Sequence, residues 1–231
     1  MILIFDLDDT LYDESSFVAS GLGAVARHGE YAYGWNAGRS LDFMLDVLER
    51  EGRGQVFDRW LALHEQLSKA RVAECVNIYR HHRPSLELFP AARVVLDRYR
   101  GLVPLYLVTD GHKVVQKNKV DALGLFAEFR RVFITHRFGI RHAKPSPHCF
   151  ELIRQAEGCS WADMVYVGDN PTKDFVNLKP LGALTVRVKT GGHRNVVARR
   201  GYDAQISIPN LDALPEMLAA HFQPSRSSLS A

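Results

Sequence analysis

Three carboxylates, Asp6, Asp8 and Asp9, follow an apolar run at the start of the chain, Ile2 to Phe5. Such a run is typical of a buried strand, so we expect the acids at its carboxyl end, where open α/β sheets bind ligands. Asp6 and Asp8 lean to the same side if the extended geometry continues, and they then need a cation or a shared proton. A turn that caps a helix explains the cluster equally well, and this stretch alone does not separate the two interpretations.

Thr109, Asp110 and Gly111 follow a second apolar run, 103–108. The threonine hydroxyl can donate to a phosphate oxygen, and the glycine lets the backbone approach a ligand closely. The helix predicted to follow would offer free N–H groups to an anion. Taken alone, a strand-to-helix turn with Asp110 as its cap is the simpler explanation.

Lys144 and Asp169 stand at two further element boundaries. A lysine before a helix can neutralise a bound anion and pair with a carboxylate, although most such lysines are solvated. Asp169, with Asp174 five residues later, could join Asp6 and Asp8 around a hard divalent cation such as Mg²⁺. The stretch is also a good turn sequence. Each of these four strand ends could be a turn when taken alone. Together they carry an acid, a hydroxyl, a lysine and a second acid, and four coincidental turns are a poorer explanation of that set than one shared site.

The elements that must position these residues alternate between strand and helix after residue 84. A helix is expected to begin at Pro90, with Val94, Val95 and Tyr99 facing inward. Such alternation predicts a parallel sheet covered on both faces. The further predicted strands are 132–135, 165–167, 184–188 and an edge strand at 204–208, and the further predicted helices are 113–123, 147–156, 174–181 and 211–221.

Residues 14–83 show helical spacing of apolar positions and no convincing strand. Because this block separates the first strand from the second, we expect it beside Asp6, well placed to be a lid. The predicted organisation is a catalytic core formed by 1–13 and 84–222, a helical cap formed by 14–83, and a disordered tail, 223–231.

The composition is ordinary for a soluble protein and excludes several functional classes. The 231 residues are 46% hydrophobic and 24% charged, with a net charge of +3, which is too small to argue for nucleic-acid binding. The basic run from Arg187 to Arg200 lacks interleaved aromatic residues and is interpreted as solvated surface. We recognise no signal peptide and no segment that could span a bilayer.

Three scattered cysteines, Cys75, Cys149 and Cys159, predict free thiols in a reducing compartment. We therefore expect a cytoplasmic protein, either a monomer or a homodimer, that has no nucleic-acid or membrane partner.

The ordered motifs resemble those of the haloacid dehalogenase (HAD) superfamily, in the phosphoglycolate phosphatase and nucleotidase-like subgroup with a helical cap inserted after the first motif. The resemblance covers residues 1 to about 210. It implies a Rossmann-like parallel sheet with an inserted cap, a Mg²⁺ ion and an aspartyl-phosphate intermediate. The matching residues are Asp6-Leu7-Asp8-Asp9-Thr10, Thr109-Asp110-Gly111, Lys144-Pro145 and Gly168-Asp169 with Asp174.

The resemblance also implies roles for the acids of this chain. Asp6 would be the nucleophile, its pKa kept low by Mg²⁺ and Lys144. Asp8 would protonate the leaving alcohol and then activate water. The Mg²⁺ ligands would be Asp6, the main-chain carbonyl of Asp8 and Asp169. Asp9 has no implied chemistry, and we expect it to tie down its loop through backbone hydrogen bonds.

The remaining motif residues are expected to bind the phosphoryl group. Lys144, Thr109 and the N–H of Gly111 would offset its charge, and Asp110 belongs to the same substrate-binding set. Asp174 would either orient Lys144 or support the metal site.

The aspartate at position 8 distinguishes phosphoryl transfer from dehalogenation within the family. The dehalogenases proper attack carbon and lack this aspartate, so the resemblance implies phosphoryl transfer. We expect a Mg²⁺-dependent phosphatase acting on a small phosphorylated metabolite. A phosphomutase and a catalytically idle phosphate-binding module are the alternatives. Candidate side chains for substrate selection are Tyr12, Arg27, His28, Trp35, Tyr79, Arg80, His81, His82 and Arg83.

Overall fold

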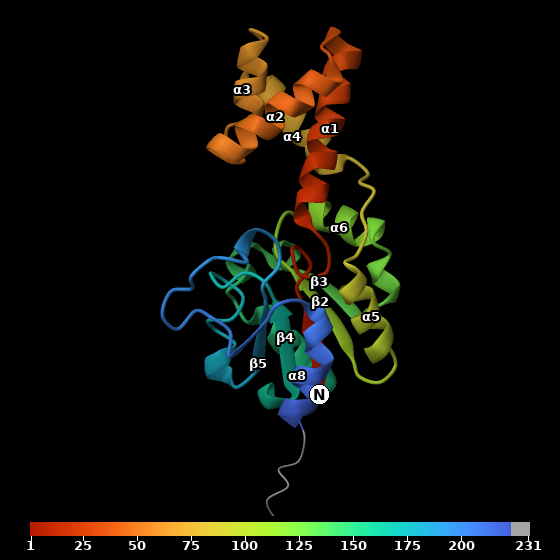
Figure 1. The fold of residues 1–231 in the computed structure, drawn as a ribbon, viewed down its shortest axis with the longest axis vertical. Helices are drawn as coiled ribbons and strands as arrows, with labels where there is room; N and C mark the ends of the chain where they lie inside the picture. Colours follow the sequence, from red (N-terminus) through yellow and green to blue (C-terminus); the bar gives the residue numbers. More distant parts are fainter. Residues whose placement is uncertain (223–231) are drawn as a thin grey trace, which may run out of the picture. The chain divides into compact units, whose positions relative to one another are not determined.

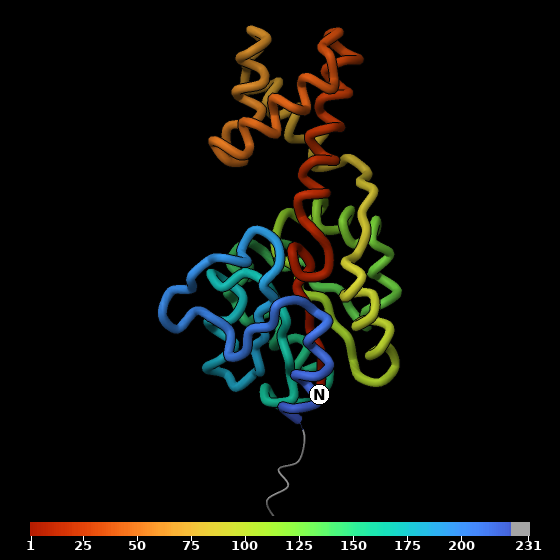
Figure 2. Tube along the Cα trace, viewed as in Figure 1, coloured from red at the N-terminus to blue at the C-terminus, as the bar shows by residue number. Residues whose placement is uncertain are grey.

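The computed structural model describes residues 1–222, which Figures 1 and 2 follow from the N-terminus. The predicted disordered tail, 223–231, lies outside the described residues. The chain divides into two compact units. The first comprises Met1–Asp13, Leu88–Gly111 and the chain from Phe126 onward, and the second comprises Glu14–Glu87 and His112–Leu125.

A six-stranded sheet forms the centre of the first unit, with its strands all parallel in the order β3-β2-β1-β4-β5-β6. Its central strand pairs on both sides, with Leu3 opposite Leu105 and Val165. The predicted Rossmann-like α/β fold class is confirmed. The strands are β1 (Ile2–Phe5), β2 (Leu105–Thr109), β3 (Arg131–Ile134), β4 (Met164–Gly168), β5 (Leu184–Val188) and β6 (Ile206–Ile208).

The side chains of β1 alternate between the two faces of the sheet and are all buried. Ile2 and Ile4 belong to a core that also includes Phe150 and Ile153 of helix α7 (His148–Glu157). Leu3 and Phe5 point to the opposite face. Burial of β1 on both faces explains why its sequence is continuously apolar rather than alternating.

Helix α5 (Pro90–Tyr99) begins at Pro90 as predicted, but its buried stripe is different from the predicted one. Val95 is buried as expected, whereas Val94 is 61% exposed and Leu96 is buried in its place. The buried positions follow the helical period from Ala92, and this period turns Val94 to the outside.

The helix predicted at 174–181 is wrong. This segment forms turns and a single 3₁₀ turn at Lys179–Leu181. Pro180 has no N–H to donate to a preceding helical turn, and the side chain of Asp174 accepts a hydrogen bond from the Asn170 N–H. The chain closes the first unit with helix α8 (Leu214–Phe222).

The second unit is helical, and its described residues contain no strand. Asn36 and Ser68 accept hydrogen bonds from backbone N–H groups at the starts of α2 and α4, which places these helix boundaries. The helices of the unit are α1 (Glu14–Tyr33), α2 (Ala37–Glu51), α3 (Val56–Leu63), α4 (Lys69–His81) and α6 (Lys113–Ala122).

Helix α6 falls in the predicted core range 84–222, but it belongs to the second unit. The Asn118 side chain donates to the carbonyls of Arg80 and His82, and Lys119 pairs with Glu14 at 3.1 Å. The boundaries of the predicted core and cap stay predictions. Among residues 1–222, no helix has the length and apolar content needed to cross a membrane.

Two glycines of α1 predict opposite responses to alanine. A Cβ on Gly29 would lie 2.7 Å from ring carbons of the buried Trp60, whereas a Cβ on Gly23 would meet the Arg27 guanidinium at 3.4 Å and Leu41 Cδ2 at 4.0 Å. We expect Gly29→Ala to lower the free energy of unfolding by about 1–3 kcal/mol through overpacking. Gly23→Ala should raise it by about 0.5–1 kcal/mol through helix propensity. Urea unfolding followed by circular dichroism checks both, and equal effects would contradict this packing.

Candidate active site

Polar side chains from several strand ends gather at the carboxyl edge of the sheet. The Asp6 N–H donates to the Val167 carbonyl at 2.8 Å, which continues the pairing of β1 with β4 beyond the end of β1. Thr109, the last residue of β2, is fully buried. Asp6, Lys144, Asp169 and Asp174 are all 7% exposed or less. Residues from separate motifs are therefore enclosed together at this edge.

The Lys144 ammonium bridges two carboxylates. Its Nζ donates to Asp6 Oδ1 at 2.5 Å and to Asp174 Oδ1 at 3.0 Å. Asp174 is held in turn by the Tyr166 hydroxyl, at 3.1 Å, and by the Asn170 N–H, at 2.9 Å. The Lys144 ammonium therefore lies between Asp6 and Asp174, and the predicted role of Asp174 stays a prediction.

The carboxylate of Asp110 is occupied by donors from the protein. It accepts hydrogen bonds from Thr135 Oγ1 at 2.5 Å, from the Lys144 N–H at 3.1 Å and from Lys173 Nζ at 3.1 Å. Burial would raise the pKa of Asp110, but Lys173, Thr135 and Lys144 together hold it below its usual value. These contacts tie the end of β2 to the loop that carries Lys144. The predicted contact of Asp110 with substrate stays a prediction.

Asp8 lies beside Asp6 in the chain, but its carboxylate has a partner of its own. The Tyr12 hydroxyl donates to Asp8 Oδ1 at 2.6 Å. Tyr12 is fully buried, and its predicted part in substrate selection stays a prediction. Its hydroxyl fixes the direction of the half-buried Asp8 side chain.

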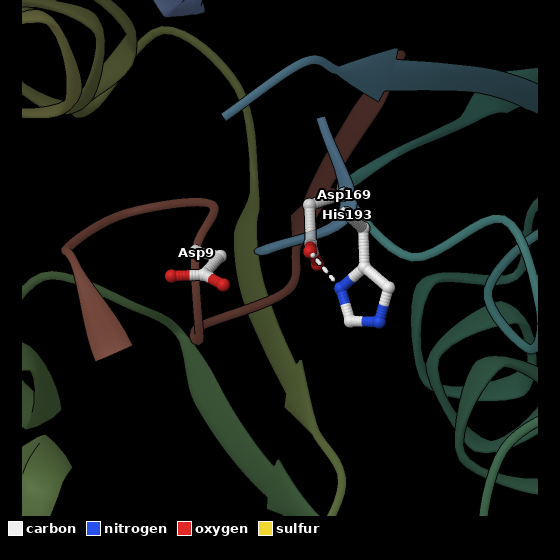
Figure 3. A group of neighbouring side chains, drawn as sticks. All are labelled: Asp9, Asp169 and His193. Atoms are coloured by element: carbon white, nitrogen blue, oxygen red, sulfur yellow. Dashed lines mark hydrogen bonds and ion pairs between the residues drawn. The ribbon is translucent and has the colours of Figure 1, made fainter. Parts of the chain in front are cut away.

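The loop after β5 reaches the same edge of the sheet. The His193 Nδ1–H donates to Asp169 Oδ2 at 2.8 Å, and Figure 3 shows the imidazole pointing to that carboxylate. The Gly192 N–H donates to Asp9 Oδ2 at 2.9 Å, and the Thr190 hydroxyl donates to the Asp9 carbonyl. The prediction that Asp9 ties down its loop through backbone hydrogen bonds is confirmed.

Lys173 and His193 were not predicted as site residues. Lys173 directly precedes Asp174, so its position next to a motif acid was a usable signal. His193 lies in the basic run that was interpreted as solvated surface, and only the fold brings it to Asp169.

Negative charge exceeds positive charge where Asp6, Asp169 and Asp174 meet. One oxygen from each lies within 4.8 Å of the others. Burial raises the pKa of the Asp6 carboxyl to about 8 in spite of Lys144, and the neighbouring acids add to this shift. Burial likewise raises the pKa of Asp169 to about 6, with His193 opposing the change. Lys144 alone therefore does not keep the pKa of Asp6 low.

The Lys144 ammonium stays charged at this site. Burial would lower its pKa, but Asp174 and Asp6 together raise it above the usual value for a lysine. Three buried carboxylates against this single buried ammonium form a set of hard oxygen ligands with excess negative charge. That donor set fits a divalent cation such as Mg²⁺. The predicted ligand set of Asp6, the Asp8 carbonyl and Asp169 stays a prediction.

The candidate residues for substrate selection in the second unit have partners within that unit. His28 lies 3.1 Å from Glu74, and the Trp35 ring stacks on His64 with centroids 3.9 Å apart. Their predicted role in substrate selection stays a prediction. The other candidates in this unit are the half-buried Tyr79, the buried His82 and the exposed Arg27, Arg80, His81 and Arg83.

A family model for haloacid dehalogenase-like hydrolases matches residues 1–181. The chain belongs to this hydrolase family. The resemblance predicted from the motifs is thereby confirmed for the family as a whole.

Named relatives of this HAD-like hydrolase include phosphatases and a dehalogenase. The chain is 27% identical over 208 residues to the glyceraldehyde 3-phosphate phosphatase of Methanocaldococcus jannaschii, covering 84% of this chain and 87% of the relative. It is 33% identical over 123 residues to the phosphoserine phosphatase of Thermus thermophilus, covering 52% and 48%. The solved 2-haloacid dehalogenase of Pseudomonas syringae matches with a TM-score of 0.64 and 21% identity, covering 95% and 98%. At that identity the likeness shows the fold alone.

Removal of Lys144 tests the charge arrangement of this HAD-like hydrolase. We expect Lys144→Met, measured in chelator, to lower the free energy of unfolding by about 3–5 kcal/mol, because buried carboxylates lose their partner. The matched control is Lys117→Met in α6, which removes an ion pair to Asp121 whose side chains are 52% and 45% exposed. That control should change stability little. Urea unfolding measures both variants, and equal losses would contradict a buried ion pair at Lys144.

Proposed function

We propose that this chain is a Mg²⁺-dependent phosphatase that hydrolyses a small phosphomonoester through an aspartyl-phosphate on Asp6. The observation that carries the proposal is a pair of aspartates in separate environments. Asp6 is buried against Lys144, whereas the half-buried Asp8 is held by Tyr12. A nucleophile and a proton carrier need such a separation, because one must be ionised while the other exchanges protons.

In the proposed first step, a carboxylate oxygen of Asp6 attacks phosphorus. The bond from Asp6 to phosphorus forms as the ester bond to the leaving oxygen breaks, and Asp8 donates its proton to that oxygen. Lys144 fixes the orientation of the Asp6 carboxylate through the 2.5 Å contact. Lys144 and the Thr109 hydroxyl would offset charge on the phosphoryl oxygens.

The second step releases inorganic phosphate. Asp8, now a carboxylate, takes a proton from water as the water oxygen attacks phosphorus, and the bond from phosphorus to Asp6 breaks. The hydrogen bond from Tyr12 keeps the Asp8 carboxylate in one direction for both proton transfers. Asp6 returns to its carboxylate form, ready for another turnover.

Asp6 and Asp169, with the main-chain carbonyl of Asp8, would hold Mg²⁺. When bound, Mg²⁺ supplies positive charge that offsets the charge on the transferring phosphoryl group and on the crowded carboxylates. The excess of buried carboxylates over ammonium groups at this edge supports the assignment. Asp174 would contribute by holding Lys144 rather than by direct contact with substrate.

The relatives support a small substrate. Their names specify glyceraldehyde 3-phosphate and phosphoserine, which are both small phosphomonoesters. We propose the same class for this chain, with substrate selection by residues 14–83. The three cysteines are free, which suits a reducing compartment, and we propose a cytoplasmic location.

Two aspartate variants test the two steps. Asp6→Asn should abolish phosphate release from p-nitrophenyl phosphate, because the nucleophile is lost. Asp8→Asn should lower the steady-state rate by about 10²–10⁴-fold, the usual size of an acid–base contribution. An aryl leaving group needs little protonation, so rapid mixing of Asp8→Asn with this substrate should still give a burst of nitrophenol of up to one equivalent.

Thr185→Ser, at a buried position of β5 away from the carboxyl edge of the sheet, serves as a control for a core substitution outside the site and should retain activity. Full activity of Asp6→Asn, or of the wild type in excess EDTA, would overturn the mechanism. Isomerised product without free phosphate would identify a phosphomutase. Comparing kcat/KM across glyceraldehyde 3-phosphate, phosphoserine, phosphoglycolate, nucleotides and sugar phosphates would then define the preferred substrate.

A further inference from the structure

Residues 190–193, which we name the clamp loop, touch two motif loops at once. The Thr190 hydroxyl donates to the Asp9 carbonyl, and the Gly192 N–H donates to Asp9 Oδ2 at 2.9 Å. The His193 Nδ1–H donates to Asp169 Oδ2 at 2.8 Å (Figure 3). The same short segment is therefore bound to the loop after β1 and to the loop after β4.

The fit of the clamp loop depends on a glycine. Gly191 has φ +59, and a Cβ there would lie 2.0 Å from Asp9 Cγ, which no real contact allows. Gly201, later in the same connection, also has a positive φ, +84, but a Cβ there would meet nothing within 4 Å. The need for glycine at 191 thus has two sources, backbone conformation and close approach to Asp9, whereas at 201 only the first applies.

Asp169 depends on this loop for its orientation. It is 3% exposed, and within residues 1–222 the bond from His193 is the one hydrogen bond that its carboxylate accepts. A carboxylate that binds a cation needs its other contacts to set the direction of its oxygens, and loss of such a contact commonly weakens binding 10–100-fold.

We infer that His193 is a positioning residue for Asp169 and that the clamp loop sets the affinity of the site for Mg²⁺. This rests on the proposed function, in which Asp169 helps to hold the cation. His193 occupies Asp169 Oδ2 and so leaves Oδ1 for the cation. The contacts to Asp9 hold His193 in place, so a change in the loop reaches the cation site without altering any of its ligands.

A second cation site is the competing explanation for the same residues. Asp9, Asp169 and His193 offer ligand atoms within 4.8 Å of one another, and two carboxylates with an imidazole suit a transition metal. All three groups are already engaged, because the His193 Nδ1–H donates to Asp169 and Asp9 Oδ2 accepts from Gly192. An ion would have to replace both hydrogen bonds, so the geometry favours the positioning role.

Calorimetric titration of Mg²⁺ into the whole chain without substrate tests the inference directly. We expect His193→Leu, which has no donor, to weaken Mg²⁺ binding by about 10–100-fold. His193→Asn, whose amide can still donate, should recover part of the affinity. His221→Leu, at an exposed position on α8, is the matched control and should bind as the wild type does. The Mg²⁺ concentration for half-maximal phosphate release should shift by the same factor as binding.

A glycine pair tests the loop without removing any polar side chain. Gly191→Ala should push the clamp loop off Asp9 and reproduce the loss seen with His193→Leu. Gly201→Ala carries a similar backbone cost in open space and should leave Mg²⁺ binding unchanged. Circular dichroism in chelator verifies that each variant is folded. If His193→Leu does not fold, the comparison of Gly191→Ala with Gly201→Ala still tests the inference.

Unchanged Mg²⁺ affinity in folded His193→Leu and Gly191→Ala would overturn the inference. It would also be overturned if Mn²⁺ titration gave two ions per wild-type chain and one in His193→Leu, since that identifies a second cation site. Wild-type protein that binds Mg²⁺ but hydrolyses no phosphomonoester would overturn the proposed function alone. Wild-type protein that binds no Mg²⁺ would remove both.

Discussion

Buried like charge at one edge of the sheet is the constraint on which the first unit depends. Parallel strands bring their carboxyl ends to the same edge, and the loops there enclose Asp6, Asp169 and Asp174. An unpaired buried ion costs several kcal/mol, so each carboxylate requires a nearby partner. Lys144 serves two of them and His193 serves the third. These contacts join the loops after β1, β3, β4 and β5 to one another.

The positions of the first acids could be predicted because their cause is local. An apolar run that ends in an acid marks the end of a buried strand, and parallel strands place such ends together. The proximity of Asp6 and Asp169 can therefore be predicted, because they come directly after β1 and β4, and these two strands pair with each other. The position of Lys144 in the site was harder to predict, because a lysine before a helix is usually solvated. It could be predicted only because the other motifs accompany it in the order of the family. The helical character of residues 14–83 is equally local, because it lies in the spacing of apolar side chains.

The remaining partners could not be predicted because their contacts join distant segments. Nothing near His193 in the sequence indicates a carboxylate, and 24 positions separate it from Asp169. Lys173 reaches Asp110 across 63 positions. Tyr12 has a close partner, Asp8, but an aromatic residue after a loop is as typical of a ligand contact as of a buried donor. The wrong helix at 174–181 has the same origin, because Asp174 turns inward to Lys144 rather than capping a helix.

Backbone strain at the contact between Asp9 and the clamp loop indicates that the surroundings hold this contact in place. Asp9 has φ +55 and Gly191 has φ +59, so both sides of the contact adopt the left-handed region. A non-glycine residue in that region costs on the order of 1 kcal/mol and persists only where the surroundings enforce it. Here the enforcing bonds come from Thr190 and Gly192. Asp9 is also covalently next to Asp8, so the same bonds restrain the loop that carries both proposed catalytic aspartates. Through His193 the clamp loop reaches Asp169 as well, and one short segment thereby fixes the acids of two strand ends relative to each other.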